Sequence, residues 1–321
     1  MILAKTPLRI PLAGGLSDLA PYASRFGGET ISATVDKYVY VTVKDDLDGR
    51  FDVRYRDSHE RTDAGRQVRH DLLREALLLT GLADRPLDVD FRVDLAGESG
   101  LGTSGALTVS ILHALRRLTG GNVDPWSLLL EAAEVEVDRL RGASGFHDPA
   151  ICALGGIRRL GYDGESVRDV GLDLAEGIVE RFEDAFLLFY SGRHLKSKPS
   201  LDLLTSHLDE ALPVLHDIRA LVPTLADAFA RGDLAGIAEA FGEQQRLKQR
   251  LPGRFVDEEV EALVARVRAT GAEAQLPGGK ISAFVMVVAP DGQKAAVREA
   301  LSDLREVPLR LVQEGTRSVM L

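Results

Sequence analysis

Apolar and charged residues alternate over residues 87–93, and this period of two predicts a strand with one buried face. A helical period follows, in which apolar residues recur three or four positions apart at Leu107, Ile111, Leu112 and Leu115. Between the two lies the stretch 97–106, which combines glycines with hydroxyl-bearing residues. A strand, a glycine loop and a helix are therefore predicted in direct succession, and the rest of the chain is arranged around this unit.

The same two patterns predict the remaining elements. Strands, some ending in a turn, are expected at residues 2–16, 30–43, 51–63, 155–162, 186–190, 283–288 and 309–312. Helices are expected at residues 67–80, 125–140, 201–220, 222–231, 234–248, 257–270 and 292–304. Residues 36–38, which include Asp36 and Lys37, interrupt the second of these strands. Because strands and helices interleave without strict alternation, the pattern favours an α+β fold.

The loop at 97–106 has the expected layout of an anion site. A strand that enters a glycine loop before a helix aims free backbone N–H groups and the positive end of the helix dipole at one point, which favours phosphate. An ordinary glycine-rich turn capped by Thr103 or Ser104 explains the same residues. The loop is not a Walker A sequence, since no lysine follows its final glycine. On the residues alone, both interpretations stay open.

Four charged residues stand out by their surroundings. Arg9 lies among apolar neighbours, where a charge needs either a partner or a chemical role. Asp18 follows two glycines, and Asp148 lies in a second glycine-rich segment at 142–149; both positions are also typical of Asp in plain turns. Glu136 lies beside the apolar stripe of its predicted helix, although a charged helix is usually a solvated face.

Composition excludes several classes of protein. A chain of 321 residues has room for two domains, or for one large one. The formal net charge of −10, from 39 Lys and Arg against 49 Asp and Glu, argues against a general nucleic-acid binder. Cys152 is the only cysteine, so neither an intramolecular disulfide nor a cysteine-based zinc site is expected. With no signal peptide and no long apolar run, a cytoplasmic location without a membrane partner is expected.

Several of these features occur in an order that resembles the GHMP kinases, the superfamily of galactokinase, homoserine kinase, mevalonate kinase and phosphomevalonate kinase. The resemblance rests on Arg9, on the segments 13–19, 32–40 and 99–104, on Asp148, on the glycine turn at 278 and on the tail 309–318. Within the superfamily the chain is most similar to the D-glycero-D-manno-heptose 7-phosphate kinase and fucokinase-like branch. The resemblance implies a two-domain GHMP kinase fold, with a ribosomal protein S5 domain 2-like N-terminal domain at 1–170 and a ferredoxin-like α+β C-terminal domain at 171–321.

The resemblance also implies ATP and Mg²⁺ in the cleft between the two halves. The residues that would wrap the ATP phosphates are Ser99, Gly100, Leu101, Gly102, Thr103, Ser104 and Gly105. Mg²⁺ is a hard cation that prefers oxygen ligands. Ser104 and Glu136 would supply these ligands, with Glu134 as the alternative carboxylate.

For the reaction, the resemblance implies phosphoryl transfer to a sugar hydroxyl, which depends on positioning and charge neutralisation. Asp148 would orient the attacking hydroxyl or accept its proton. Arg9 would pair with Asp148, keep it ionised and steady charge in the transition state. Asp18 and Gly15 would contact the sugar, since a carboxylate accepts two hydrogen bonds from neighbouring hydroxyls.

The implied acceptor is a small-molecule sugar or sugar phosphate, phosphorylated at its anomeric hydroxyl, with heptose 7-phosphate as the first candidate. The phosphate of such a substrate would need cations, for which Lys37, Arg193, Lys196 and Lys198 are candidates. Two alternatives stay open: a kinase of an unphosphorylated sugar such as fucose, galactose or an amino sugar, and a catalytically silent relative that senses a ligand. A homodimer is compatible with any of them.

Three departures from the family pattern concern the site. His147 and Pro149 flank Asp148 where related sugar kinases carry a Gln-Asp-Gln-like segment. The late glycine run of the family is replaced by residues 277–282, which include Lys280. Gly105 replaces a serine or alanine, a change expected to be harmless.

Overall fold

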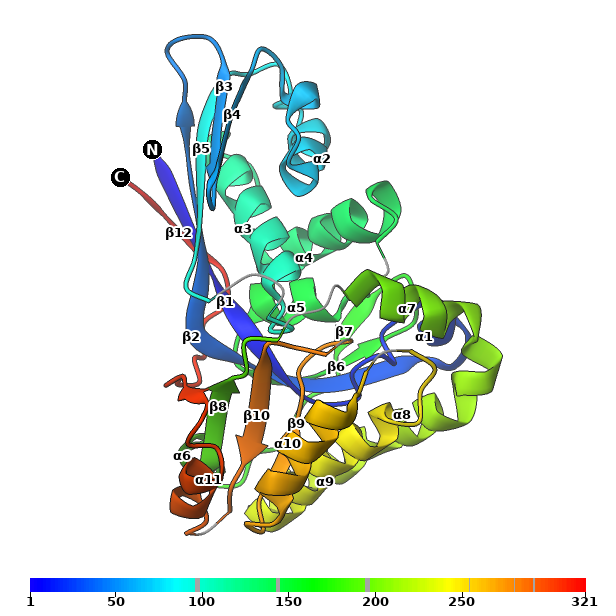
Figure 1. Cartoon of the computed structure of the whole chain (residues 1–321). Coiled ribbons are helices and arrows are strands. Elements are labelled where there is room, and N and C mark those ends of the chain that lie inside the picture. Colours follow the sequence, from blue (N-terminus) through cyan, green and yellow to red (C-terminus); the bar gives the residue numbers. More distant parts are fainter. Residues whose placement is uncertain (96–98, 143–144, 194–196, 254, 280, 291) are drawn as a thin grey trace.

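The structure is a computed structural model that describes residues 1–95, 99–142, 145–193, 197–253, 255–279, 281–290 and 292–321. In this part of the chain, two β-sheets are covered by helices (Figure 1). The α+β class predicted from the sequence is confirmed.

The larger sheet is built on two long strands, β1 (Ile2–Ala13) and β2 (Gly28–Asp45), which pair antiparallel. Within the described ranges the strand order is β12-β1-β2-β5-β3-β4, and β6 and β7 extend the sheet from the first part of β2. The other strands of this sheet are β3 (Phe51–Tyr55), β4 (Ser58–Thr62), β5 (Leu87–Val93), β6 (Ile157–Tyr162), β7 (Val167–Asp169) and β12 (Arg317–Met320).

A bulge bends β2 where the sequence places charges in mid-strand. The register between β1 and β2 shifts after Pro7, so that Asp36 and Lys37 have no opposing residue in β1. Extra residues in one strand bend it and increase its twist. The part of β2 before the bulge pairs with β6, and the part after it pairs with β5. The predicted interruption is therefore a bend within one continuous strand.

Four helices cover one side of the larger sheet (Figure 1): α2 (Asp71–Thr80), α3 (Thr103–Leu118), α4 (Pro125–Ala133) and α5 (His147–Leu154). Helix α3 is the central one, because it packs on both β1 and β2 with its predicted apolar face and is itself contacted by α2, α4 and α5. Directly after α4 the chain changes to a π-helix at Glu134–Arg139. The predicted helix 125–140 thus alters its winding at the turn that carries Glu136.

The smaller sheet, in the order β11-β8-β10-β9 within the described residues, separates two apolar clusters. Its strands are β8 (Phe186–Tyr190), β9 (Glu273–Gln275), β10 (Phe284–Val288) and β11 (Arg305–Glu306). Successive residues of a strand face opposite sides. In β8, Phe186 and Leu188 therefore join the core shared with the larger sheet, whereas Leu187 and Phe189 pack with α10 (Glu258–Arg268) and α11 (Lys294–Ala300). One continuous core joins the two halves.

The remaining helices are α1 (Ala20–Phe26), α6 (Ile178–Ala185), α7 (Ser197–Ser206), α8 (Leu208–Arg231) and α9 (Leu234–Lys248). Two predictions about helices were wrong. The break predicted between 220 and 222 lies instead at His207, between α7 and α8. Helix α8 continues across Pro223 because its apolar face, which includes Val222 and Leu225, is buried, so that packing outweighs the proline. Helices α1, α5 and α6 were not predicted, since seven or eight residues are too few to display a helical period.

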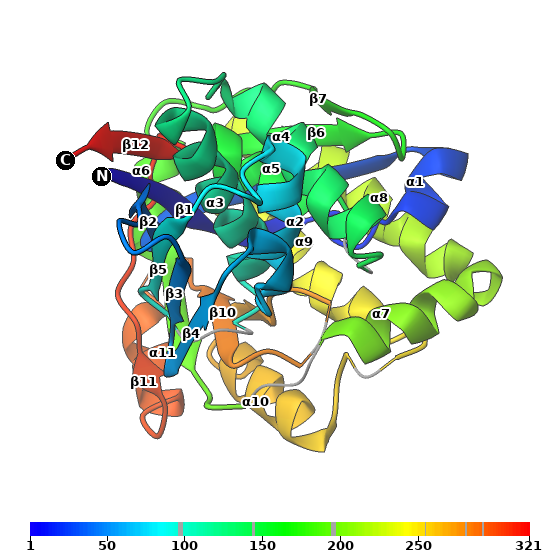
Figure 2. The ribbon, with the colours of Figure 1, turned by 90° about the horizontal axis from the view of Figure 1, so that it is seen from above.

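The C-terminal segment also differs from the prediction. Residues 309–312 do not form a strand, because Leu311 makes only an isolated bridge with Val35. The last strand is instead β12, which pairs with β1 and brings the two chain ends side by side (Figures 1 and 2). The boundary predicted between residues 170 and 171 stays a prediction. Of the helices that the structure describes, none has the length and apolar character to cross a membrane.

Candidate active site

A cavity of about 420 Å³ lies where the larger sheet, the start of α3 and the end of α9 meet. This volume falls in the range of roughly 300–1,000 Å³ that small-molecule sites occupy. Ten of the residues predicted for the site line it: Arg9, Gly15, Asp18, Ser99, Gly100, Gly102, Thr103, Ser104, Glu136 and Asp148. Segments that are far apart in the sequence thus meet at one place, which is why the cavity is our candidate site.

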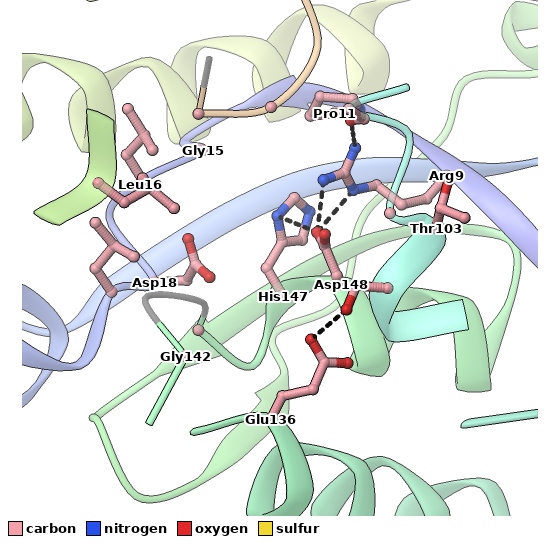
Figure 3. A pocket seen from close by; sticks show the side chains of 18 of the residues that line it. Arg9, Pro11, Gly15, Leu16, Asp18, Thr103, Glu136, Gly142, His147 and Asp148 are labelled. Carbon is pink, nitrogen blue, oxygen red and sulfur yellow. Dashed lines mark hydrogen bonds and ion pairs between the residues drawn. The ribbon is translucent and has the colours of Figure 1, made fainter. Parts of the chain in front are cut away.

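The Arg9–Asp148 pair is the main electrostatic contact of the cavity (Figure 3). Arg9 Nε and Nη2 donate to the same oxygen, Oδ1 of Asp148, at 2.9 and 2.6 Å. Arg9 Nη1 donates to the backbone oxygen of Gly100 at 2.5 Å, so one guanidinium holds the carboxylate and the glycine loop together. Burial raises the pKa of Asp148, but the charge and hydrogen bonds of Arg9 outweigh this and hold the pKa below its usual value.

Two glycines of the loop make this pairing sterically possible. A Cβ on Gly102, whose φ is +75°, would lie 2.8 Å from Cγ of Arg9. A Cβ on Gly105 would lie 2.6 Å from the backbone nitrogen of Pro149 and 2.8 Å from Cβ of Asp148. At Gly105, α3 therefore lies too close to α5 to leave room for a side chain, and the expectation that a glycine is harmless at this position stays a prediction.

His147 and Asp18 flank the pair (Figure 3). His147 shares a 2.5 Å hydrogen bond between Nε2 and Oγ of Ser32, and its Nδ1 lies 3.6 Å from Oδ1 of Asp148. The pKa of His147 is lowered to about 3, mainly by burial and to a smaller extent by the positive charge of Arg9. The imidazole is therefore neutral near pH 7. Burial, followed by the charge of Asp148, raises the pKa of Asp18 to about 6.

Glu136 and Ser104 form the second polar contact of the cavity. Ser104 Oγ donates to Glu136 Oε2 at 3.0 Å, and Thr108 Oγ1 donates to Glu136 Oε1 at 2.8 Å. Thr108 was not predicted from the sequence, where it is one polar position within an apolar helix. Among the described residues no group of three or more His, Cys, Asp and Glu side chains is arranged to bind a metal. A serine and a carboxylate fit Mg²⁺, since this ion usually takes few protein ligands and completes its shell with water and phosphate oxygens.

The turn around Gly278 and Gly279, called the third glycine turn below, packs against the glycine loop and forms one wall of the cavity. A Cβ on Gly100 would lie 2.5 Å from the backbone oxygen of Pro277, and Ser282 Oγ donates to the backbone oxygen of Ser99. Gly278 and Gly279 line the cavity. Residues 97–98 of the loop and Lys280 of the turn lie outside the described residues.

The end of α9 contributes polar side chains that sequence reasoning missed. Gln244 accepts from the backbone nitrogen of Gly14 at 2.9 Å and donates to the oxygen of Gly15 at 3.4 Å. Lys248 donates to the backbone oxygens of Leu276 and Gly278 at 2.7 and 2.9 Å. Nothing in the sequence distinguishes these buried side chains from the exposed Lys and Gln of an ordinary helix.

Four of the predicted residues do not line the cavity. Lys37 lies at the bulge of β2 and pairs with Asp36, and Arg193 forms ion pairs with Asp257 and Glu259. The substrate-binding role predicted for Lys37 and Arg193 gains no support from these positions, because carboxylates outside the cavity already satisfy both cations. Leu101 and Gly105 are buried beneath the loop rather than exposed to the cavity. Lys196 and the side chain of Lys198 lie outside the described residues.

Comparison with known proteins finds a family domain that is similar to part of the chain. Residues 68–156, which include the glycine loop, α3, Glu136 and Asp148, match the model of the GHMP kinases N terminal domain. This part of the chain is similar to that domain. It is 22% identical over 275 residues to D-glycero-alpha-D-manno-heptose 7-phosphate kinase of Campylobacter jejuni, covering 82% of this chain and 81% of the relative. It is 31% identical over 185 residues to mevalonate kinase of Methanothermobacter thermautotrophicus, which covers 50% of this chain and 58% of that relative.

Solved structures confirm the predicted fold. A D-glycero-D-manno-heptose 1-phosphate kinase from Bacteroides thetaiotaomicron has a TM-score of 0.83 at 22% identity, over 100% of this chain and 99% of that one. Phosphomevalonate kinase of Streptococcus pneumoniae, in complex with phosphomevalonate and AMPPNP, has a TM-score of 0.79 at 16% identity, over 97% and 100%. The predictions of a GHMP kinase fold and of a phosphotransferase with a hydroxyl acceptor are confirmed.

Gly105→Ala tests whether the contact between α3 and α5 sets the position of Asp148. The added methyl group must push the first turn of α5 away, because the nearest atoms belong to backbone. We expect the free energy of unfolding to fall by roughly 1–3 kcal/mol and kcat to fall about 10- to 100-fold through misplacement of the carboxylate. Gly121→Ala, whose Cβ would have no neighbour closer than 3.4 Å, should leave both unchanged. Equal effects of the two substitutions would contradict this interpretation.

The raised pKa of Asp18 predicts a pH-dependent loss of stability. The folded state keeps the Asp18 proton up to about pH 6, whereas the unfolded chain loses it near pH 3.8. Between these values the folded state binds more protons, so its stability falls as the pH rises. Relative to Asp18→Asn, we expect the wild-type free energy of unfolding to drop by roughly 2 kcal/mol between pH 4.5 and 7.5, measured by urea denaturation. The exposed Asp227, changed to Asn, is the control; a wild-type difference from Asp18→Asn that is flat with pH would contradict the prediction.

Proposed function

We propose that the chain is an ATP-dependent kinase that phosphorylates the anomeric hydroxyl of a sugar phosphate, with D-glycero-D-manno-heptose 7-phosphate as the first candidate. The observation that carries the proposal is the Arg9–Asp148 pair within hydrogen-bonding reach of the glycine loop, in one cavity. The choice of substrate is supported by the names of two relatives, a heptose 7-phosphate kinase and a heptose 1-phosphate kinase.

On this proposal the glycine loop and the start of α3 hold the ATP phosphates. The backbone N–H groups of the first turn of α3 have no partner within the helix, and the helix dipole adds positive potential at the same end. Ser104 and Glu136 would hold Mg²⁺, which when bound neutralises charge on the phosphate oxygens. Glu136 is buried and already fixed by Thr108, so its carboxylate needs little rearrangement.

Asp148 would act on the acceptor. Its lowered pKa keeps it ionised at neutral pH, so it can accept a hydrogen bond from the anomeric hydroxyl and receive or guide its proton. Arg9 keeps this carboxylate in place through Oδ1, which leaves Oδ2 for the acceptor. His147 lies on the other side of Asp148 and is neutral, so it adds no second positive charge beside the carboxylate. Asp18 would bind a further sugar hydroxyl across the cavity.

The proposal is tested with ATP, Mg²⁺ and a panel of acceptors: heptose 7-phosphate, the free heptose, fucose and galactose. We expect ADP release only with the phosphorylated heptose, and a second, anomeric phosphate signal from the 1,7-bisphosphate product in the ³¹P NMR spectrum. Asp148→Asn should reduce kcat by a factor of about 10² or more while the Kd for ATP changes little. Asp169→Asn, which breaks a surface pair with Arg158, is the matched control and should keep full activity.

Turnover of a free sugar in preference to its phosphate would contradict the substrate class. The absence of turnover with every acceptor, together with retained ligand binding, would favour the silent sensor instead.

A further inference from the structure

Lys248 is a buried cation whose position the mechanism above does not explain. It is the last residue of α9, its exposed fraction is 2%, and it lines the same cavity as Arg9 and Asp148. Its Nζ donates to two backbone oxygens of the third glycine turn, those of Leu276 and Gly278. A lysine ammonium has three N–H donors, so these two bonds leave one for another acceptor.

The charge of Lys248 is not balanced by the described protein. Among the described residues no carboxylate forms an ion pair with it, and the charge that acts most strongly on it is that of Arg9, which is repulsive. Burial, with this repulsion, lowers its pKa to about 7. An unpaired ammonium at a cavity wall is stabilised when an anion enters the cavity.

A side chain that only held the third glycine turn in place by hydrogen bonds would not need a charge. The residue beside it, Gln245, fixes the same turn with a neutral side chain by accepting from the backbone nitrogen of Leu276 at 3.0 Å. Gln244 likewise holds the Gly14–Gly15 turn with a neutral side chain, by hydrogen bonds to the backbone of both glycines. A cation at position 248 is therefore an addition to what holding the turns requires, and it fits a negatively charged ligand.

Lys248 holds Gly278, which lies against Gly100 of the glycine loop, so its assignment to the acceptor rests on its neighbour Gln244 and on what already surrounds the ATP side. Gln244 and Lys248 are one helical turn apart and share a face of α9. Gln244 contacts the Gly14–Gly15 turn, which leads directly to Asp18 on the proposed sugar side. The proposed ATP side already has the glycine loop, the N-terminus of α3 and Ser104. Among the described residues that line the cavity, the lysines and arginines are Arg9 and Lys248. Arg9 already forms an ion pair with Asp148, which leaves Lys248 for an anionic ligand.

We propose that Lys248 binds the phosphate group that the acceptor already carries, and thereby selects a sugar phosphate over the free sugar. This inference rests on the proposed function, because it assigns a residue to the anionic end of that substrate. The third N–H of Lys248 donates to a phosphate oxygen while the other two keep the third glycine turn in place.

Lys248→Gln removes the positive charge but keeps hydrogen-bond donors, since an amide can still donate to the third glycine turn. With the full-length protein we expect kcat/KM for the sugar phosphate to fall about 10- to 100-fold, the loss expected for a charge-assisted hydrogen bond. The kcat/KM for the same sugar without its phosphate and the KM for ATP should stay within about twofold. Inorganic phosphate should compete with the acceptor in the wild type and at least tenfold less well in the variant. Lys44→Gln, at a surface lysine paired with Asp88, is the matched control and should change none of these values.

Three results would overturn the inference: equal losses for the two sugars, a rise confined to the KM for ATP, or unchanged competition by inorganic phosphate. The first result would identify Lys248 as a structural clamp, and the second would assign it to the nucleotide. Lys248→Met, which removes charge and hydrogen bonds together, should lose the same selectivity if it folds. If no acceptor is turned over, the proposed function fails by itself. Calorimetry with inorganic phosphate then decides about Lys248, since equal binding by the wild type and Lys248→Gln would refute its role.

Discussion

The Arg9–Asp148 ion pair is the contact on which the rest of the site depends. A guanidinium with an exposed fraction of 4% needs a carboxylate, and a carboxylate in the cavity needs a cation to remain ionised. The same guanidinium also reaches the backbone oxygen of Gly100. A single side chain on β1 therefore fixes the distance between the proposed base on α5 and the proposed phosphate loop before α3.

The fold supplies the close approaches that this contact requires. Gly102 gives Arg9 space to pass the loop, and Gly105 lets α5 lie against α3 with Asp148 in its first turn. The π-helix after α4 carries Glu136, whose carboxylate meets Ser104 and Thr108. Gln244 and Lys248 of α9 form hydrogen bonds to the Gly14–Gly15 turn and to the third glycine turn, so one helix contacts both turns. The cavity is thus lined by residues from both halves of the chain, which also share one core.

Local patterns in the sequence predicted the elements that are long enough to repeat them. The alternation at 87–93 and the helical period after Gly105 both correspond to observed elements, and α9 has the predicted bounds of 234–248. The short helix α5 was predicted as a loop, although Asp148 within it was recognised. Contacts between residues far apart in the sequence gave no signal: the space at Gly105 is limited by Pro149, and Lys248 is hydrogen-bonded to Gly278. The basic residues predicted for a substrate phosphate were chosen by charge alone, and Lys37 and Arg193 have carboxylate partners outside the cavity.

The most direct test of the account is a double-mutant cycle on Arg9→Met and Asp148→Asn, measured as single-turnover rates of phosphoryl transfer at saturating ATP. Residues that act as one unit are strongly non-additive. The account predicts that each single variant loses most of the rate, by a factor of about 10² or more, and that the double variant is no slower than the slower single variant within about threefold. Multiplication of the two losses in the double variant would contradict it, because Arg9 and Asp148 would then act independently.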